Sequence, residues 1–290
     1  MNRSYLFVPG DSGRKFSKAA ESAADALIVD LEDAVSAANK PAARACIPGF
    51  LDTDCAPELW VRINPLDSED AAADLSALEG LAPAGIVLPK ANGADDIRRL
   101  GERLASMEQR AGLERNSLKI LPLVTERPAA LFRMGEYASA TERLAALTWG
   151  AEDLAAAIGA ESNQDSAGAW LAPYQLARSL CLVAAAAAGV PAIETVYTDV
   201  RDTAGAADFA RAARRDGFSG MLLVHPAQIA PVHDALTPDE AEIEFAEKVV
   251  ARFDEDPDAG VVAIDGRMID RPHYLQARRL LDIARRAGKR

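Results

Sequence analysis

The sequence predicts a (β/α)8 TIM barrel with a C-terminal helical extension. Short apolar runs recur along the chain, and each is followed by a stretch with helical spacing. The runs are continuously apolar rather than alternating, as expected of strands that are buried on both faces of a parallel sheet. Eight such runs span about 230 residues, which is close to the usual size of this barrel, about 250 residues.

The runs predict eight strands in a regular order along the chain. They are SYLFVP (4–9), ALIVDL (26–31), LWVRIN (59–64), GIVLPK (85–90), KILPLV (119–124), LAALTW (144–149), PAIETVY (191–197) and GMLLVHP (220–226). Between them, segments rich in alanine, arginine and leucine have the spacing of amphipathic helices. The clearest of these segments are 94–110, 127–137, 170–188 and 202–215.

A doubly wound open sheet is the alternative architecture. Such a sheet usually carries a glycine-rich phosphate turn after an early strand. The sequence contains no G-x-G-x-x-G motif, and the nearest segment is GDSG at 10–13. The barrel is therefore the favoured interpretation.

The C-terminal part differs from the repeating pattern. We assign residues 1–236 to the barrel and residues 237–290 to a helical extension that packs on its own or a neighbouring subunit as a lid. The segment 238–253 is amphipathic with Pro238 at its start, as is common for helices. An acidic turn and the segment VVAIDGRMIDRPH follow, and a basic helix is expected over 272–290.

The composition excludes several classes of function. The chain has 290 residues, of which 49% are apolar and 26% charged, and its net charge of −12 argues against nucleic acid or an anionic membrane as a partner. No uninterrupted apolar window approaches the roughly 18 residues of a membrane span, and the N-terminus is too short and polar for a signal peptide. The three cysteines have no metal-ligand spacing, so a reducing cytoplasm is the expected location.

Polar side chains follow the predicted strands at the points where these strands end. In a TIM barrel such residues converge on one opening. The strand ends carry Asp30, Glu32 and Asp33; Arg62 and Asn64; Lys90; Thr125 and Glu126; Glu152 and Asp153; Thr195 and Tyr197; and His225. Because several carboxylates in one opening repel each other unless a cation intervenes, we expect a bound metal ion. With few cysteines and histidines available, the expected ion is Mg²⁺, with Mn²⁺ as an alternative.

Two of these positions have more than one interpretation. Arg62 is the one arginine at a predicted strand end; it either pairs with Glu32 or Asp33, or provides a fixed cation for a carboxylate or an enolate oxygen, and both roles can coexist. The adjacent acids Glu152 and Asp153 begin a helix, so they either cap it or include a metal ligand.

An ordered set of motifs resembles a known family. The segments RSYLFVPGDSGRKFSKA, ADALIVDLEDAV, VRINP, VLPKA, VTE, WGAEDLAAAIG, GFSGMLLVHPAQI and GRMIDRPH occur in this order from residue 3 to about 280. The chain thus resembles the citrate lyase β-subunit-like branch of the HpcH/HpaI aldolase family, which includes malyl-CoA and citramalyl-CoA lyases. This resemblance implies a barrel of the phosphoenolpyruvate/pyruvate-binding kind and a Mg²⁺-dependent CoA ester lyase.

The resemblance also assigns roles to individual residues. It implies that Glu126 and Asp153 bind the metal and that Arg62 binds substrate. Glu32 and Asp33 are then partners of a metal-bound water or of Arg62.

Further roles follow from the same comparison. Asp270, in the MID motif, acts in acid–base catalysis and reaches in from a neighbouring subunit, while Arg14 and Lys15 lie near the CoA phosphates. We also expect Asn64 and Lys90 to contribute to the binding of the substrate.

The implied reaction cleaves malyl-CoA, citramalyl-CoA, citryl-CoA or a similar 3-hydroxyacyl-CoA acid into acetyl-CoA and a 2-keto acid. A homo-oligomer, either a trimer or a hexamer, is the implied assembly. The alternatives are a metal-dependent pyruvate-type aldolase that uses no CoA, a citrate lyase β-subunit that acts on an acyl-carrier protein, and a catalytically silent barrel.

The chain departs from the family pattern at two positions. Many relatives have a lysine before the HP segment where this chain has Met221, and a threonine after the metal glutamate where it has Arg127. The first departure weakens the expectation of any role for that lysine here. The second places another cation beside the metal ligand, where it either favours a more acidic substrate or pairs with Glu152.

Overall fold

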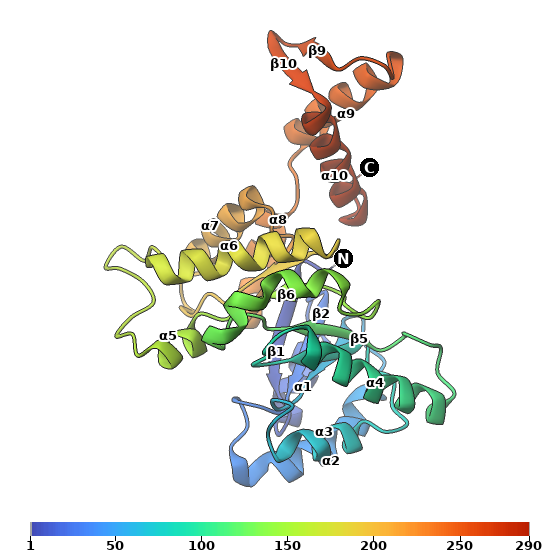
Figure 1. Cartoon of the computed structure of the whole chain (residues 1–290), viewed down its shortest axis with the longest axis vertical. Coiled ribbons are helices and arrows are strands. Elements are labelled where there is room, and N and C mark those ends of the chain that lie inside the picture. The colour runs from blue at the N-terminus through green and yellow to red at the C-terminus, as the bar shows by residue number, and fades with distance from the viewer. Residues whose placement is uncertain (1, 290) are drawn as a thin grey trace. The chain divides into compact units, whose positions relative to one another are not determined.

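The computed structural model describes residues 2–289. The chain divides into two compact units, Asn2–Val232 and the part from His233 onward. Figure 1 follows the chain through its labelled elements from the N-terminus in blue to the C-terminus in red.

The first unit is built on one parallel sheet of eight strands, as the sequence predicts. The strands are β1 (Ser4–Pro9), β2 (Ala26–Asp30), β3 (Glu58–Arg62), β4 (Gly85–Leu88), β5 (Lys119–Pro122), β6 (Leu147–Thr148), β7 (Ala192–Glu194) and β8 (Gly220–Leu223). Their order is β5-β4-β3-β2-β1-β8-β7-β6. The two ends of this order meet through parallel bridges between Ile120 and Leu144 and between Leu123 and Thr148. The sheet therefore closes into the expected TIM-like barrel.

The strands are buried on both faces. All residues of β2, β4 and β8 are buried, in agreement with the continuous apolar runs of the sequence. Inside the barrel, Tyr5, Ile28, Trp60, Leu121 and Leu222 belong to one hydrophobic cluster. This packed interior places the functional residues at the ends of the strands rather than along the barrel axis.

The helices of the first unit surround the strands. They are α1 (Gly13–Ala20), α2 (Lys40–Leu51), α3 (Asp70–Ala77), α4 (Ala94–Ala111), α5 (Glu152–Ile158), α6 (Ala172–Ala187) and α7 (Thr203–Asp216), with the short 3-10 helices η1 (Ala37–Asn39) and η3 (Pro226–Gln228). The segment predicted as a helix over 127–137 is the 3-10 helix η2 (Pro128–Ser139) rather than an α-helix. Gly135 within it costs an α-helix about 1 kcal/mol relative to alanine.

The second unit is a small helical hairpin with a β-hairpin between its helices. Helix α8 (Ile229–Leu236) contains the boundary between the units, and α9 (Glu240–Glu255), β9 (Val261–Ile264), β10 (Arg267–Asp270) and α10 (Arg271–Arg286) follow. Strands β9 and β10 pair in an antiparallel register across Asp265 and Gly266. Both turn residues have positive φ, as the favoured two-residue hairpin turn requires.

Two helix starts in this unit are set by capping boxes. Helix α9 begins at Glu240 rather than at Pro238, and Asp239 caps it and exchanges hydrogen bonds with Glu242. Asp270 caps α10 and pairs with His273 in the same way. Among residues 2–289, no helix combines the length and apolar character needed to cross a bilayer.

Candidate active site

A cavity of about 280 Å³ opens where the barrel strands end. Its charged lining residues are Asp30, Asp33, Arg62, Glu126, Glu152 and Asp153, and its apolar ones include Phe7, Leu123, Trp149, Val196, Leu222 and Val224. Most of these residues end or follow one of six strands, β2, β3, β5, β6, β7 and β8, so the predicted convergence of strand ends is observed. The charged lining residues can bind charged groups, and the apolar ones can exclude water.

Arg62, the last residue of β3, is held in place by acids from β2 and the loop after it. Its Nε and Nη2 donate to Oδ1 and Oδ2 of Asp30 at 2.7 and 2.6 Å, and its Nη1 lies 3.0 Å from Oε2 of Glu32. The guanidinium carbon lies 4.7 Å above the ring centre of Phe7. Burial acts to lower the pKa of Arg62, but the charge and hydrogen bonds of Asp30 outweigh it and hold the pKa above its usual range. Arg62 is therefore a fixed cation in the wall of the cavity.

Lys90 connects three acids around the same opening. Its ammonium donates to Glu32 at 2.6 Å and to Asp33 at 3.2 Å, and lies 3.1 Å from Oδ1 of Asp153. Its backbone N–H also donates to Oε2 of Glu126. Lys90 has a φ of 51°, which is uncommon for a residue other than glycine. This backbone conformation lets the amide N–H of Lys90 reach Glu126 while its side-chain ammonium reaches Glu32, and the surrounding contacts hold it in place.

Glu126 and Asp153 form the pair of acids that most needs a cation. Burial, and next the negative charge of Asp153, raise the pKa of Glu126 to about 8. Glu126 is 3% exposed. A Cβ at Gly150 would lie 3.2 Å from Oε1 of Glu126, so glycine here allows the loop after β6 to approach the carboxylate.

These residues fit a Mg²⁺ site. Mg²⁺ is usually bound by one or two protein carboxylates and keeps several waters. In the described part of the chain, no group of three or more His, Cys, Asp or Glu side chains is arranged to hold a metal ion. Glu126 and Asp153 meet the smaller requirement: burial and the charge of Asp153 disfavour the ionised form of Glu126 and raise its pKa, and a bound cation would offset both effects.

The two adjacent acids at the start of α5 have different surroundings. Oε1 of Glu152 accepts a hydrogen bond from Nδ2 of Asn163 at 2.8 Å. Asp153 instead lies beside Lys90 and Glu126. Arg127 makes two hydrogen bonds to Asp67, at 2.7 and 2.8 Å, rather than pairing with Glu152.

Several predicted residues lie outside the cavity lining. Asn64 is 2% exposed and bonds through its amide to Asp74 and to the carbonyl of Leu31. Arg14 and Lys15 are exposed in the first turn of α1. Asn64 is thus placed to organise the loop after β3.

Thr195 lines the cavity, whereas three other strand-end residues serve local structure. Thr125 exchanges hydrogen bonds with the backbone of Gly150, Tyr197 donates to Asp202, and His225 caps η3. Asp270 belongs to the second unit, where it caps α10.

Two contributions were not assigned from the sequence. The first is Asp30, which is the main partner of Arg62. An acid at the end of a continuous apolar run is the signal that could have indicated this pairing. Glu194, at the end of β7, is completely buried and holds Trp149 in the cavity wall. The presence of a glutamate inside the apolar run PAIETVY is the signal that could have revealed this role.

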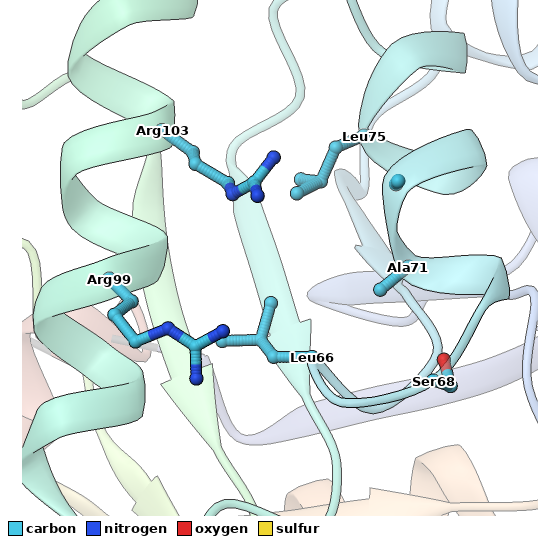
Figure 2. A pocket seen from close by; sticks show the side chains of 7 residues that line it. Leu66, Ser68, Ala71, Leu75, Arg99 and Arg103 are labelled. Atoms are coloured by element: carbon cyan, nitrogen blue, oxygen red, sulfur yellow. The ribbon is translucent and has the colours of Figure 1, made fainter.

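A second, smaller cavity of about 60 Å³ lies between α3 and α4 (Figure 2). Arg99 and Arg103 of α4 face Leu75 and Leu66 across it, and Ser68 lies at its edge. Among the described residues, no acid lines this cavity, so it does not share the metal-binding character of the larger one.

Comparisons with known proteins show what the chain is similar to. The family model described as HpcH/HpaI aldolase/citrate lyase matches residues 3–226. A citrate lyase subunit beta-like protein of Mycobacterium tuberculosis is 35% identical over 286 residues, covering 98% of this chain and 95% of that protein. A (3S)-malyl-CoA thioesterase of Cereibacter sphaeroides is 33% identical over 285 residues, covering 96% and 93%.

A solved structure extends this similarity to three dimensions. The crystal structure of the protein CitE from Mycobacterium tuberculosis, in complex with magnesium, acetoacetate and coenzyme A, matches with a TM-score of 0.82. The sequences are 35% identical, and the match covers 99% of this chain and 98% of that one.

Proposed function

We propose that this chain, which belongs to the HpcH/HpaI aldolase/citrate lyase family and is thus an enzyme of the carbon–carbon lyase class, is a Mg²⁺-dependent CoA ester lyase. Its substrate is a 3-hydroxyacyl-CoA acid such as malyl-CoA, citramalyl-CoA or citryl-CoA, and its products are acetyl-CoA and a 2-keto acid. The family membership confirms the resemblance that the motifs indicated.

One observation carries the proposal. Glu126, Asp153 and Arg62 line the same cavity, so an acidic pair that suits Mg²⁺ lies beside a fixed cation that suits a carboxylate or an enolate. The solved relative that binds magnesium, acetoacetate and coenzyme A supports the same combination of ligands.

The acidic pair would hold the metal, and the other residues would manage charge and protons. Glu126 and Asp153 would hold Mg²⁺, which would supply Lewis-acid chemistry to the oxygens of the substrate. As the C–C bond breaks, the substrate's hydroxyl group loses its proton to water at the opening and becomes the carbonyl of the keto acid. The electron pair of the broken bond remains on the thioester fragment as an acetyl-CoA enolate. Arg62, held by Asp30, stabilises this negative charge. Asp270 protonates the enolate carbon and acts as the base in the condensation direction.

The surroundings of this centre prepare it for the reaction. Glu32 bridges Arg62 and Lys90, which fixes both cations before the substrate arrives. Asp33 is more exposed than Glu32, so it can contact a water or substrate group at the opening. The apolar lining residues, such as Leu222 and Val224, keep water away from the carbanion-like fragment.

The CoA end of the substrate needs a separate binding surface. Arg14 and Lys15 are exposed at the start of α1, directly after the carboxyl end of β1, and their charges complement phosphates. Lys90 and Asn64 would act indirectly, through the acids and the loop that they hold. We further propose that the enzyme works in the cytoplasm as a homo-oligomer, either a trimer or a hexamer.

A parallel substrate assay tests this function. The purified protein is incubated with Mg²⁺ and with malyl-CoA, citramalyl-CoA or citryl-CoA, and the release of the keto acid is measured. We expect cleavage of at least one thioester and none after chelation of the metal. Cleavage of free hydroxy-keto acids without CoA would instead identify a pyruvate-type aldolase, and activity only with an acyl-carrier protein would identify a citrate lyase β-subunit.

A further inference from the structure

Strand β6 is the most weakly paired strand of the barrel, although the segment after it carries Asp153. It has two residues, Leu147 and Thr148, and pairs with β7 through these two positions. On its other side, β5 is joined to this segment by isolated bridges and not by a continuous ladder. Main-chain hydrogen bonds alone therefore hold the segment between β6 and Asp153 less firmly than they hold the ends of the other strands.

A buried carboxylate from β7 compensates for this weak pairing. Glu194 is completely buried, and its Oε1 accepts hydrogen bonds from the indole Nε1 of Trp149 at 2.5 Å and from the backbone N–H of Thr195 at 2.9 Å. Its Oε2 accepts from Nε of Arg178 at 2.7 Å. Both carboxylate oxygens are thus used, and one side chain joins β6, β7 and α6.

Trp149 connects this carboxylate to the cavity. It directly follows β6, is completely buried and lines the cavity together with Gly150 and Asp153. The indole ring and the backbone of Gly150 are held from two directions, because Thr125 exchanges hydrogen bonds with Gly150 at 3.0 and 3.1 Å. Glu194 of β7 and Thr125 of the loop after β5 therefore hold the backbone from which the turn to Asp153 starts.

We propose that Glu194 is a positioning residue for the metal centre: by fixing Trp149, it sets the turn that presents Asp153 next to Glu126. This inference rests on the proposed metal-dependent function. Glu194 does not line the cavity, so it acts through Trp149 and not by touching the substrate.

Arg178 makes this arrangement sensitive to the charge on Glu194. Its Nη1 also donates to Asp216 at 2.6 Å, and its guanidinium lies 4.6 Å above the ring centre of Phe218. Arg178 is thus fixed and keeps its donor aimed at residue 194. In Glu194→Gln the single amide oxygen is expected to turn towards this cation, which leaves the amide NH₂ facing the N–H groups of Trp149 and Thr195.

The test measures metal affinity instead of turnover. Mn²⁺ binding to the full-length protein is followed by electron paramagnetic resonance in the wild type, Glu194→Gln, Trp149→Phe and the double variant. Residues that orient metal ligands typically contribute about 10- to 100-fold to metal affinity. We expect each single variant to bind Mn²⁺ about tenfold more weakly, and the double variant to be no weaker than the weaker single one.

A matched control separates positioning from general stability. Glu108 and Arg143 form a second buried pair, at 2.5 Å, which lies near the amino end of β5, away from the cavity. Glu108→Gln is expected to lower the thermal midpoint while leaving Mn²⁺ affinity within twofold of the wild type. If Glu194→Gln does not fold, Trp149→Phe, which keeps an aromatic ring but loses the indole N–H that Glu194 accepts from, decides the question alone.

The outcomes separate this inference from the proposed function. Unchanged Mn²⁺ affinity in a folded Trp149→Phe protein, or fully additive effects in the double variant, would overturn the positioning role. A wild type that binds Mn²⁺ and responds to the variants as expected, but cleaves no acyl-CoA, would contradict the proposed function and leave the positioning role intact. A wild type that binds no Mn²⁺ would overturn both.

Discussion

At the scale of single residues, the role of each acid in the cavity depends on the side chains that it contacts. Glu152 and Asp153 are adjacent in sequence and both line the cavity, yet Glu152 bonds to Asn163 while Asp153 lies beside Lys90 and Glu126. Successive residues in the first turn of a helix point in directions about 100° apart, which separates their partners. The two acids should therefore respond differently to the same substitution.

Neutralising each acid in turn tests this separation. Asp153→Asn should lower divalent-cation affinity by about 100-fold or more, because even residues that merely orient metal ligands contribute about 10- to 100-fold. Glu152→Gln should stay within a few-fold of the wild type. Titration calorimetry with Mg²⁺ measures both, and full metal-dependent activity in a folded Asp153→Asn protein would refute the ligand assignment.

Glu126 predicts a pH dependence of metal binding. Its pKa of about 8 in the metal-free protein means that it carries a proton at pH 6 and loses it as the pH rises towards 8. Because a carboxylate binds a cation in its ionised form, Mg²⁺ affinity should increase by about tenfold per pH unit between pH 6 and 8 and then level off. Calorimetry in two buffers of different ionisation enthalpy should show nearly one proton released per ion at pH 6.5. No proton release would indicate that Glu126 is already ionised.

At the scale of secondary structure, glycine positions determine how closely elements approach. Gly85 begins β4 between β3 and β5, and a Cβ there would collide with the ring of Trp60 and lie 2.6 Å from the carbonyl oxygen of Lys119. Gly101 lies inside α4, where the nearest atom to a Cβ is Cδ of Arg143 at 3.6 Å. The same substitution should therefore have opposite effects at the two sites.

Alanine variants test this difference. Gly85→Ala should destabilise the protein by about 2 kcal/mol, which is typical of overpacking against backbone atoms. Gly101→Ala should stabilise it by about 0.5–1 kcal/mol, because alanine favours the helix and restricts the unfolded chain. Urea unfolding measures both, and equal midpoints for the two variants would contradict the close packing of β4.

At the scale of the whole molecule, the proposed reaction requires a residue from the second unit. Asp270 caps α10 in its own unit, so its removal affects that helix as well as any chemistry. Asp270→Ala should lower the stability of α10 by about 1 kcal/mol, whereas Asp270→Ser keeps a capping oxygen. If Asp270 transfers the proton, both variants should retain Mg²⁺ binding and lose turnover.

Mixing two inactive variants tests whether Asp270 acts in a neighbouring subunit. Asp153→Asn supplies an intact Asp270, and Asp270→Ser supplies an intact Asp153. In randomly mixed oligomers, about a quarter of the sites combine both intact residues, so activity should reappear on subunit exchange. No recovery after verified exchange would mean that each chain completes its own site or that Asp270 has no part in catalysis.

The sequence by itself determined the fold and the family. Continuous apolar runs predicted all eight strands, because strands buried on both faces need apolar residues at consecutive positions. It also identified most charged residues of the cavity, because residues that follow barrel strands must lie at one end. The 3-10 helix η2 was missed, because its conformation depends on local geometry that periodicity does not report. The β9–β10 hairpin was missed although the Asp-Gly pair at 265–266, between two short apolar runs, is a typical hairpin signal.

Only the tertiary structure decided which side chains pair with one another. It joined Arg62 to Asp30, Asn64 to Asp74, Lys90 to acids from three loops, and Trp149 to Glu194. These partners come from different strands and helices, so their contacts depend on strand register and barrel closure, which a linear pattern does not specify. The burial of a residue follows from the local pattern of apolar residues, which the sequence shows directly. The partner of a hydrogen bond depends on which distant segments the fold brings together.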